Sequence, residues 1–302
     1  MSAGLRVSAN NAVPNTRLGA GSADGNVQGT PFWKQGVRLV VSVSMQLEAG
    51  APAVHDSLAI PDPEPGYADS VRASIEAYTY NEGIPRLLEL FDRHAIKVTS
   101  HVVGAVADSH PDLARDLVRR GHEIAAHGYS GKPTYLMTPA EERAEYQASI
   151  DTLFRAAGVR PIGFNAPGMR HSPQTLGILR SLGFLYHVDD VSRDEPFTVA
   201  VEGRPMAVVP YTLRNNDYLR YSVPSMTADD FARELNAEFS ILYEEAAVRR
   251  RMMSVTAHDR ISGTPNRVKV LDDFIAGALK RPGVAFMRKD EIAHYVLAQS
   301  GA

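Results

Sequence analysis

The sequence lacks cysteine altogether. Disulfides, thiolate nucleophiles and thiolate zinc sites are therefore excluded, and any metal has to be held by histidine, carboxylate or amide oxygen ligands. The sequence also lacks a strong excess of either charge, because the formal net charge is −3 over 302 residues. No basic stripe is left to neutralise phosphates, so we expect neither nucleic acid nor a membrane surface as a partner.

Long apolar runs are absent as well. No stretch reaches the ~18 residues that span a bilayer, and the N-terminal segment has no apolar core of the length that an export signal needs. We therefore expect a cytoplasmic protein. What remains is an ordinary globular composition with 44% hydrophobic residues, which suits one large α/β barrel or two modest domains.

Strands and helices are predicted to alternate along most of the chain. Residues 1–30 are rich in glycine, serine, asparagine and alanine without periodicity, so we expect an irregular N-terminal arm there and a single domain over residues 31–302. The segment 49–70 holds four prolines and is expected to form a functional loop. Alternation without a mid-chain linker favours one closed or nearly closed parallel α/β barrel. Strands are predicted at 37–46, 97–103, 123–127, 161–165, 184–188, 206–209, 252–257 and 284–287, and helices at 83–94, 111–120, 172–182, 227–250 and after a capping box at Thr138.

Polar side chains gather where the predicted strands end. In parallel barrels the chemistry lies at the carboxyl ends of the strands, so these positions are the candidates for a site. Glu48, His127 and His258 place a carboxylate and two histidines at three separate strand ends, which is more than chance placement suggests. The full set is Gln46, Glu48, His101, His127, Asn165, Asp189, Asp190, Asp194, Asn216, Asp217 and His258.

Each of these residues also has a purely structural interpretation. Glu48 fits a solvated loop carboxylate equally well, and His127 fits a histidine that only hydrogen-bonds loop backbone. Apolar neighbours make a satisfied core histidine the default for His101. Asp189 suits helix capping at least as well as acid–base work. Position alone therefore leaves both interpretations open.

Four segments together resemble the polysaccharide deacetylase (NodB-homology) family of carbohydrate esterases. They are residues 41–50 (VSVSMQLEAG), 121–129 (GHEIAAHGY), 165–176 (NAPGMRHSPQTL) with 183–186 (GFLY), and the segment that begins at His258. The resemblance implies a single distorted (β/α)7–8 barrel. Residues 209–217, 253–265 and 286–293 are most similar to the branch that contains cofactor-independent allantoinases and cyclic imidases.

The sequence departs from the family pattern in its first three motifs. Most members carry a pair of aspartates in the first motif, one as catalytic base and one as metal ligand, whereas this chain has Gln46 and Glu48. Their second metal-binding histidine, four residues after His127, is replaced by Gly131, and the arginine before Ala-Pro-Gly is replaced by Asn165. Because an amide cannot take a proton from water, the resemblance leaves Glu48 as the carboxylate of the site.

The resemblance and the residues present imply a hydrolase of non-peptide carbon–nitrogen bonds that acts on a small cyclic amide, imide or ureide. Glu48 is expected to activate or position water, while His127 and His258 protonate the leaving nitrogen or stabilise the oxyanion. If zinc or another divalent metal is bound, its expected ligands are Glu48, His127 and His101. The residues expected to bind the substrate are Gln46, Asn165, Asp189, Asn216 and Asp217.

Two other functions stay open at this point. One is a metal-dependent N-deacetylase of an acetamido sugar or acetylated amine, and the other is a degenerate barrel that binds a ligand without turning it over. The expected partner is a small molecule in each case. The resemblance to allantoinase-like proteins, which tend to assemble, also favours a homo-oligomer.

Overall fold

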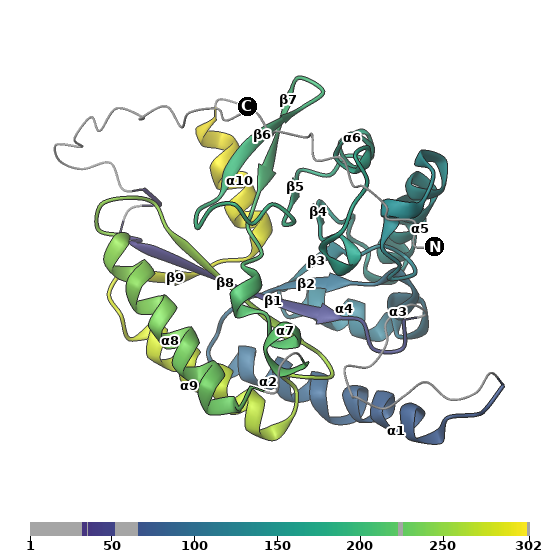
Figure 1. The fold of residues 1–302 in the computed structure, drawn as a ribbon, viewed down its shortest axis with the longest axis horizontal. Coiled ribbons are helices and arrows are strands. Elements are labelled where there is room, and N and C mark those ends of the chain that lie inside the picture. Colours follow the sequence, from purple (N-terminus) through teal and green to yellow (C-terminus); the bar gives the residue numbers. More distant parts are fainter. Residues whose placement is uncertain (1–31, 35, 52–65, 223–225, 301–302) are drawn as a thin grey trace, which may run out of the picture.

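The protein folds as a nine-stranded sheet that curls into a half-barrel with helices around it (Figure 1). This architecture comes from a computed structural model that describes residues 32–34, 36–51, 66–222 and 226–300. The expected N-terminal arm, and residues 52–65 of the expected loop, lie outside the described residues. The strand order is β6-β7-β5-β4-β3-β2-β1-β8, and β9 pairs with β1.

Strand β1 (Leu39–Leu47) is the centre of the sheet and is buried along its whole length. On one side it pairs with β8 (Met252–His258). On the other side it pairs first with β9 (Val284–Phe286) and then with β2 (Thr99–Val102). All three partners are parallel to β1, so β1, β2 and β8 bring their carboxyl ends to the same edge of the sheet.

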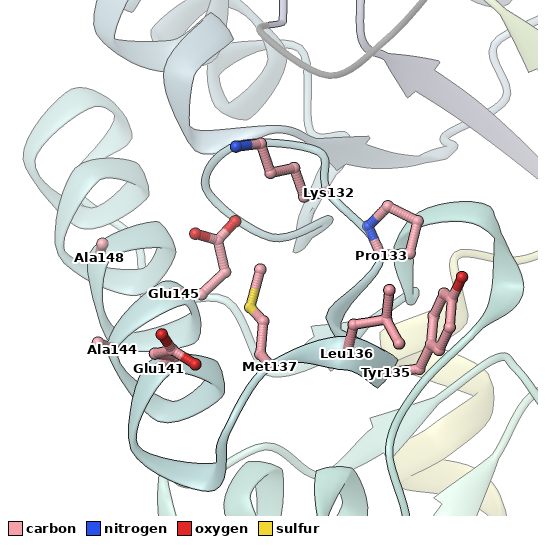
Figure 2. Close-up of a pocket in the computed structure, with 9 residues that line it drawn as sticks. All are labelled: Lys132, Pro133, Tyr135, Leu136, Met137, Glu141, Ala144, Glu145 and Ala148. Atoms are coloured by element: carbon pink, nitrogen blue, oxygen red, sulfur yellow. The ribbon is translucent and has the colours of Figure 1, made fainter.

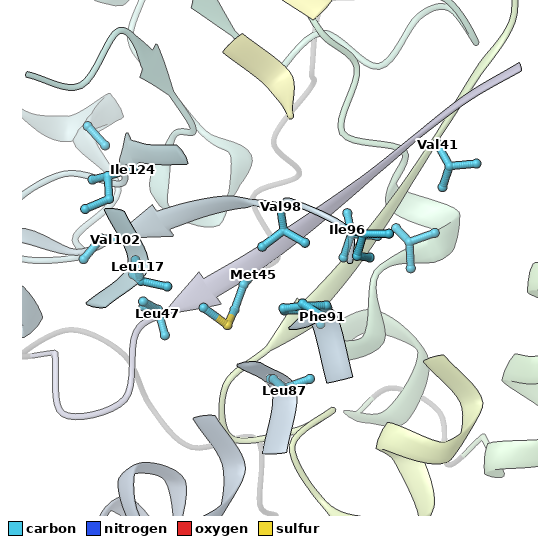
Figure 3. Packing of buried hydrophobic residues seen from close by; sticks show 14 of the residues in the cluster. Val41, Met45, Leu47, Leu87, Phe91, Ile96, Val98, Val102, Leu117 and Ile124 are labelled. Atoms are coloured by element: carbon cyan, nitrogen blue, oxygen red, sulfur yellow. The ribbon is translucent and has the colours of Figure 1, made fainter. Parts of the chain in front are cut away.

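The two faces of β1 differ in chemistry because successive side chains point to opposite sides. Met45 and Leu47 pack with Leu87 and Phe91 of helix α2 in the main apolar core (Figure 3). The alternate positions carry polar residues and face the inside of the half-barrel. They are Ser42, Ser44, Gln46 and, just beyond the strand, Glu48.

The other strands follow the predicted order with one addition. Strands β3 (Glu123–Ala126), β4 (Gly163–Phe164), β5 (Tyr186–His187) and β7 (Arg204–Val208) are parallel. Strand β6 (Phe197–Val201), which was not predicted, forms an antiparallel hairpin with β7. Its two-residue turn places Glu202 and Gly203 at positive φ, 49° and 74°, which is the backbone of a tight hairpin turn.

The structure confirms the expected distorted (β/α) barrel, in which the sheet is curled into a half-barrel. The antiparallel strand β6 ends the sheet on one side, and β8 ends it on the other. Across the gap, the described residues form an isolated bridge between Asn216 and Thr256. Strand β6 is antiparallel to its neighbour β7 and does not pair with β8. The barrel is therefore open between these two strands.

The helices lie outside the sheet, with α8 beside α9 and α10 against β6 and β7 (Figure 1). Helix α5 begins with the predicted capping box between Thr138 and Glu141 and ends at Gly158, whose φ is +74°. Among the described residues, no helix is long and apolar enough to cross a membrane. The helices α1, α3 and α7 and the short π-helical turn Thr79–Gly83 were not predicted. The α-helices are α1 (Ser70–Tyr78), α2 (Ile84–Arg93), α3 (Gly104–Ser109), α4 (Pro111–Arg119), α5 (Pro139–Ala157), α6 (Thr175–Ser181), α7 (Asp217–Ser222), α8 (Ala228–Glu245), α9 (Pro265–Leu279) and α10 (Lys289–Gln299).

Candidate active site

The ends of β1, β3 and β8 bring Glu48, His127 and His258 around one cavity of about 480 Å³. The β1–β8 register pairs Gln46 with His258, so the residues just beyond these two also lie at the same edge. Loops after β4 and β7 complete the wall. Besides the three predicted residues, the polar lining includes Asn165, Asn216, Tyr211, Tyr218 and Arg260.

Glu48 is held by His127 and Arg260, one at each carboxylate oxygen. Its Oε1 lies 3.0 Å from His127 Nε2, and its Oε2 accepts a 2.8 Å hydrogen bond from Arg260. Burial alone would raise the pKa of this carboxyl, but the charge of His258, the hydrogen bond from His127 and the charge of Arg260 together hold the pKa well below its usual range. Glu48 is therefore an ionised carboxylate at the edge of the cavity.

His127 is fixed between two acceptors. Its Nδ1 lies 2.8 Å from the main-chain oxygen of Asn165, and its Nε2 faces the carboxylate of Glu48. A carbonyl oxygen and a carboxylate oxygen can only accept, so both contacts are hydrogen bonds when both ring nitrogens carry hydrogen. In that state His127 is a positive charge beside Glu48.

His258 is oriented by an aspartate behind it. Its Nδ1 lies 2.5 Å from Asp217 Oδ1, while Asp217 Oδ2 accepts hydrogen bonds from the main-chain N–H of His258 and from the hydroxyl of Ser262. Burial lowers the pKa of His258, but the charges of Asp217 and Glu48 outweigh it and raise the pKa. With Nδ1 engaged, Nε2 is the nitrogen left to exchange a proton, and it lies 3.9 Å from Glu48 Oε2.

Asp217 and Asp189, both expected to bind substrate, contact residues of the site with their carboxylate oxygens. Asp217 is fully buried, and both its oxygens are occupied by the His258 segment. Asp189 accepts hydrogen bonds from the Asn165 amide, at 2.9 Å, and from the main-chain N–H of Ala166. It faces a separate cavity of about 490 Å³. The oxygens of both carboxylates already accept hydrogen bonds from residues of the site. Both side chains therefore support those residues.

A buried amide network lies beneath the cavity. The side-chain nitrogen of Gln46 lies 2.8 Å from the Tyr211 hydroxyl, 3.1 Å from His101 Nδ1 and 3.3 Å from Asn165 Oδ1. Asn216 donates to the same tyrosine hydroxyl at 3.1 Å. Burial drives the pKa of His101 well below its usual value, so this imidazole is neutral. Gln46 therefore supports the base of the site, while Asn165 and Asn216 line the cavity itself.

The donor set does not fit the expected metal site. In the part of the chain that the structure describes, no three histidine, aspartate or glutamate side chains are grouped to hold a metal ion. The expected third ligand, His101, is bonded to Gln46, and its ring centre is 6.5 Å from that of His127. Gly131 lines the cavity without offering a ligand. We derive no catalytic step through a metal.

A further cavity, of about 750 Å³, lies between helix α5 and the loop before it (Figure 2). It shares Pro133 with the first cavity, but none of the predicted catalytic residues lines it. Its carboxylate Glu145 accepts hydrogen bonds from the main-chain N–H groups of Tyr129 and Ser130, so this side chain holds the loop. The candidate active site is therefore the first cavity.

Sequence reasoning missed three polar residues that line the cavity, namely Arg260, Tyr211 and Tyr218. Arg260, which bonds Glu48, comes two residues after His258, so extending the strand-end argument by two residues would have found it. Tyr211, which bonds Gln46, follows β7, and had been treated only as part of a family segment. A tyrosine carries no charge that marks it as functional in a sequence.

Comparisons with known proteins show which family the chain resembles. A family model described as polysaccharide deacetylase matches residues 73–187. The crystal structure of the allantoinase PuuE is 30% identical, covers 97% of this chain and 100% of its own, and superposes with a TM-score of 0.85. A probable polysaccharide deacetylase from Pseudomonas aeruginosa PAO1 is 30% identical, with 90% and 95% covered and a TM-score of 0.81.

A curated relative, the peptidoglycan deacetylase-like protein FGM2 of Gibberella zeae, is 28% identical over 66% of this chain and 57% of its own. The chain thus covers 57% of the length of this relative and 50% of that of a peptidoglycan deacetylase from Helicobacter pylori. The fold is a half-barrel with a carboxylate and two histidines at the ends of its strands. The chain belongs to the polysaccharide deacetylase family.

Proposed function

We propose that the protein hydrolyses a carbon–nitrogen bond in a small cyclic amide, imide or ureide. The observation that carries this proposal is the grouping of Glu48, His127 and His258 around one cavity, with Asp217 behind His258. These are the parts of a water-activating centre, namely an ionised carboxylate, an oriented base and a cationic group.

The cavity supports a small substrate. Its volume of about 480 Å³ lies at the lower end of the range for small-molecule sites, roughly 300–1,000 Å³. Its wall carries the amides of Asn165 and Asn216, which suit the alternating N–H and C=O groups of an imide or ureide ring. The allantoinase that matches over its full length supports the same substrate class.

In the proposed reaction, water bound between Glu48 Oε2 and His258 Nε2 attacks the ring carbonyl carbon. His258 accepts one proton of the water at Nε2, because Asp217 keeps the hydrogen of the ring on Nδ1. Glu48 accepts the other hydrogen of the water in a hydrogen bond. A hydrogen bond from the imidazole of His127 favours the oxyanion that develops on the carbonyl oxygen.

The tetrahedral intermediate then collapses. His258 returns its proton from Nε2 to the ring nitrogen as the carbon–nitrogen bond breaks. The products are a carboxylic acid, which ionises in water, and an opened amide or ureide. No other acid is needed, since one imidazole serves both steps.

The first test is turnover of a substrate panel by the wild type and by Glu48→Gln. The panel contains allantoin, dihydropyrimidines, succinimides, hydantoins and acetylated sugars. We expect one of the rings to be hydrolysed and the variant to lose at least about 10²-fold in kcat. The matched control is Asp190→Asn, since Asp190 is also a carboxylate after a strand but lies in a different cavity.

Other results would favour the alternatives. Hydrolysis of acetylated sugars alone, lost on chelation, would make the protein a metal-dependent deacetylase. Binding of a ring without turnover would make it a non-catalytic barrel. Full activity in a folded Glu48→Gln variant would contradict the proposed role of this carboxylate.

A further inference from the structure

Arg260 is a buried cation that reaches into the active site from the loop after β8. Its side chain is only 5% exposed, and it donates a 2.8 Å hydrogen bond to Glu48 Oε2. It also lines the active-site cavity. Taking an arginine out of water is costly unless its partners are well placed, so this geometry demands a fixed carboxylate opposite it.

The residue before Arg260 holds the backbone of the same glutamate. Asp259 Oδ2 accepts hydrogen bonds from the main-chain N–H groups of Glu48 and Ala49, at 2.9 and 3.0 Å. The other oxygen of Asp259 lies 3.4 Å from the Arg260 guanidinium. Two consecutive residues therefore fix both the main chain and the side chain of Glu48.

The register of the sheet explains why this pair can act. Gln46 lies opposite His258 in the parallel β1–β8 ladder, so two residues further on, Glu48 lies beside Arg260. Position 165, where most family members keep an arginine, holds Asn165, whose amide is bonded to Asp189. The guanidinium beside Glu48 in this chain therefore comes from the loop after β8.

We propose that Arg260 is a positioning residue, which with Asp259 holds Glu48 Oε2 in place to orient the attacking water toward His258. This proposal rests on the proposed function. Glu48 has two partners that pull on different oxygens, His127 on Oε1 and Arg260 on Oε2. Loss of Arg260 frees Oε2 to rotate away from the 3.9 Å separation from His258 Nε2.

The test compares Arg260→Ala and Arg260→Lys with the wild type on the hydrolysed ring. We expect Arg260→Ala to lose about 100-fold in kcat with KM changed less than about threefold, because water orientation is lost and ring contacts remain. Arg260→Lys should recover about tenfold of that loss, since lysine restores the charge without the planar fork. Millimolar guanidinium should restore kcat in Arg260→Ala.

The matched control is Arg251→Ala at the other end of β8. Arg251 is also buried and pairs with Glu245 at 2.6 Å, so its loss removes a similar ion pair far from the site. We expect its kcat to stay near that of the wild type. Equal losses of kcat in Arg260→Ala and Arg251→Ala would overturn the proposal. It would also be overturned if guanidinium failed to restore kcat in Arg260→Ala and Arg260→Lys was no more active than Arg260→Ala.

A readout without substrate separates this proposal from the proposed function. Millimolar guanidinium should raise the Tm of Arg260→Ala by refilling the cation site, and should leave the Tm of the wild type unchanged. If no ring is hydrolysed but this rise is seen, the proposed function fails while the cation site beside Glu48 stands. If guanidinium gives no rise in Tm and no gain in kcat, the Arg260 proposal fails by itself.

Discussion

Both ends of the half-barrel bury ionisable side chains, but the partners of these side chains and the shifts of their pKa values differ between the two ends. At the carboxyl end, Glu48 contacts His127 and Arg260, and His258 contacts Asp217. Each charge there has an opposite charge within hydrogen-bonding distance, and burial is outweighed. The pKa of Glu48 is lowered and that of His258 is raised, so Glu48 stays ionised and His258 is a stronger base than an ordinary imidazole.

At the amino end, the buried groups form hydrogen bonds with hydroxyl groups. Glu123 accepts hydrogen bonds from Thr99 and Tyr186, and the amine of Lys289 lies 3.1 Å from the Ser254 hydroxyl. Burial raises the pKa of Glu123 to about 7 and lowers that of Lys289 to about 7. Since these groups are pushed toward neutrality and line none of the cavities described above, the comparison assigns chemistry to the carboxyl end and packing to the amino end.

The strongest way to break this comparison is His258→Ala. Loss of the imidazole removes both the base and the acid of the proposed reaction, so kcat should fall about 10³-fold or more. His187→Ala is the matched control, because His187 is a buried histidine on β5 that does not line the active-site cavity. Steady-state hydrolysis of the preferred ring measures both. A folded His258→Ala variant with wild-type kcat would refute the assignment of chemistry to this end.

Asp217→Asn sharpens the comparison by keeping the shape and removing the charge. The asparagine no longer fixes hydrogen on Nδ1 of His258, so the nitrogen facing the cavity loses its role as base. We expect kcat to fall about 10²–10³-fold, with circular dichroism unchanged. The pH profile of kcat distinguishes this from misfolding, since the limb that reports His258 should shift to lower pH when the charge that raises its pKa is removed.

Glu123→Gln tests the amino end through the pH dependence of stability. The folded pKa of about 7 lies above the ordinary value of 4.5, so between these pH values the folded protein retains a proton that the unfolded chain has released. The stability contributed by Glu123 is therefore full below pH 4.5 and is lost as pH rises through about 7. Glutamine cannot ionise, so Glu123→Gln avoids this loss in the free energy of unfolding, which is on the order of 3 kcal/mol.

The measurement is the difference in Tm between Glu123→Gln and the wild type across pH 4.5 to 7.5. We expect the Tm of Glu123→Gln to rise relative to that of the wild type as pH rises, while kcat stays within about threefold of the wild-type value. A flat difference would mean that Glu123 is ionised in the folded protein throughout this range. It would then resemble Glu48, and the contrast between the two ends would disappear.

How far the sequence predicts this molecule follows from the same contrast. The parallel strands and the grouping of Glu48, His127 and His258 were predicted, because strand ends in a parallel barrel share one edge. Their partners were harder to predict. Asp217 and Asp189 were assigned to substrate, since a sequence shows that a carboxylate follows a strand but not which way it turns. Strand β6 was missed because its turn depends on positive φ at Glu202 and Gly203, and a lone Glu-Gly pair is a weak signal.

Lys289→Met is the mildest test, and it examines the boundary between the two ends. The folded pKa of about 7 lies below the ordinary 10.5, so burying the charged amine costs stability below about pH 7, and this cost fades as pH rises toward 10.5. Methionine removes the charge from a fully buried site, so the variant should gain more in Tm at pH 6 than at pH 9. Because the amine of Lys289 contacts the hydroxyls of Ser42 and Ser254 and not a residue of the active-site cavity, kcat should change less than about threefold. A tenfold loss of kcat would instead show that the charge of Lys289 acts electrostatically on Gln46 and on the active site.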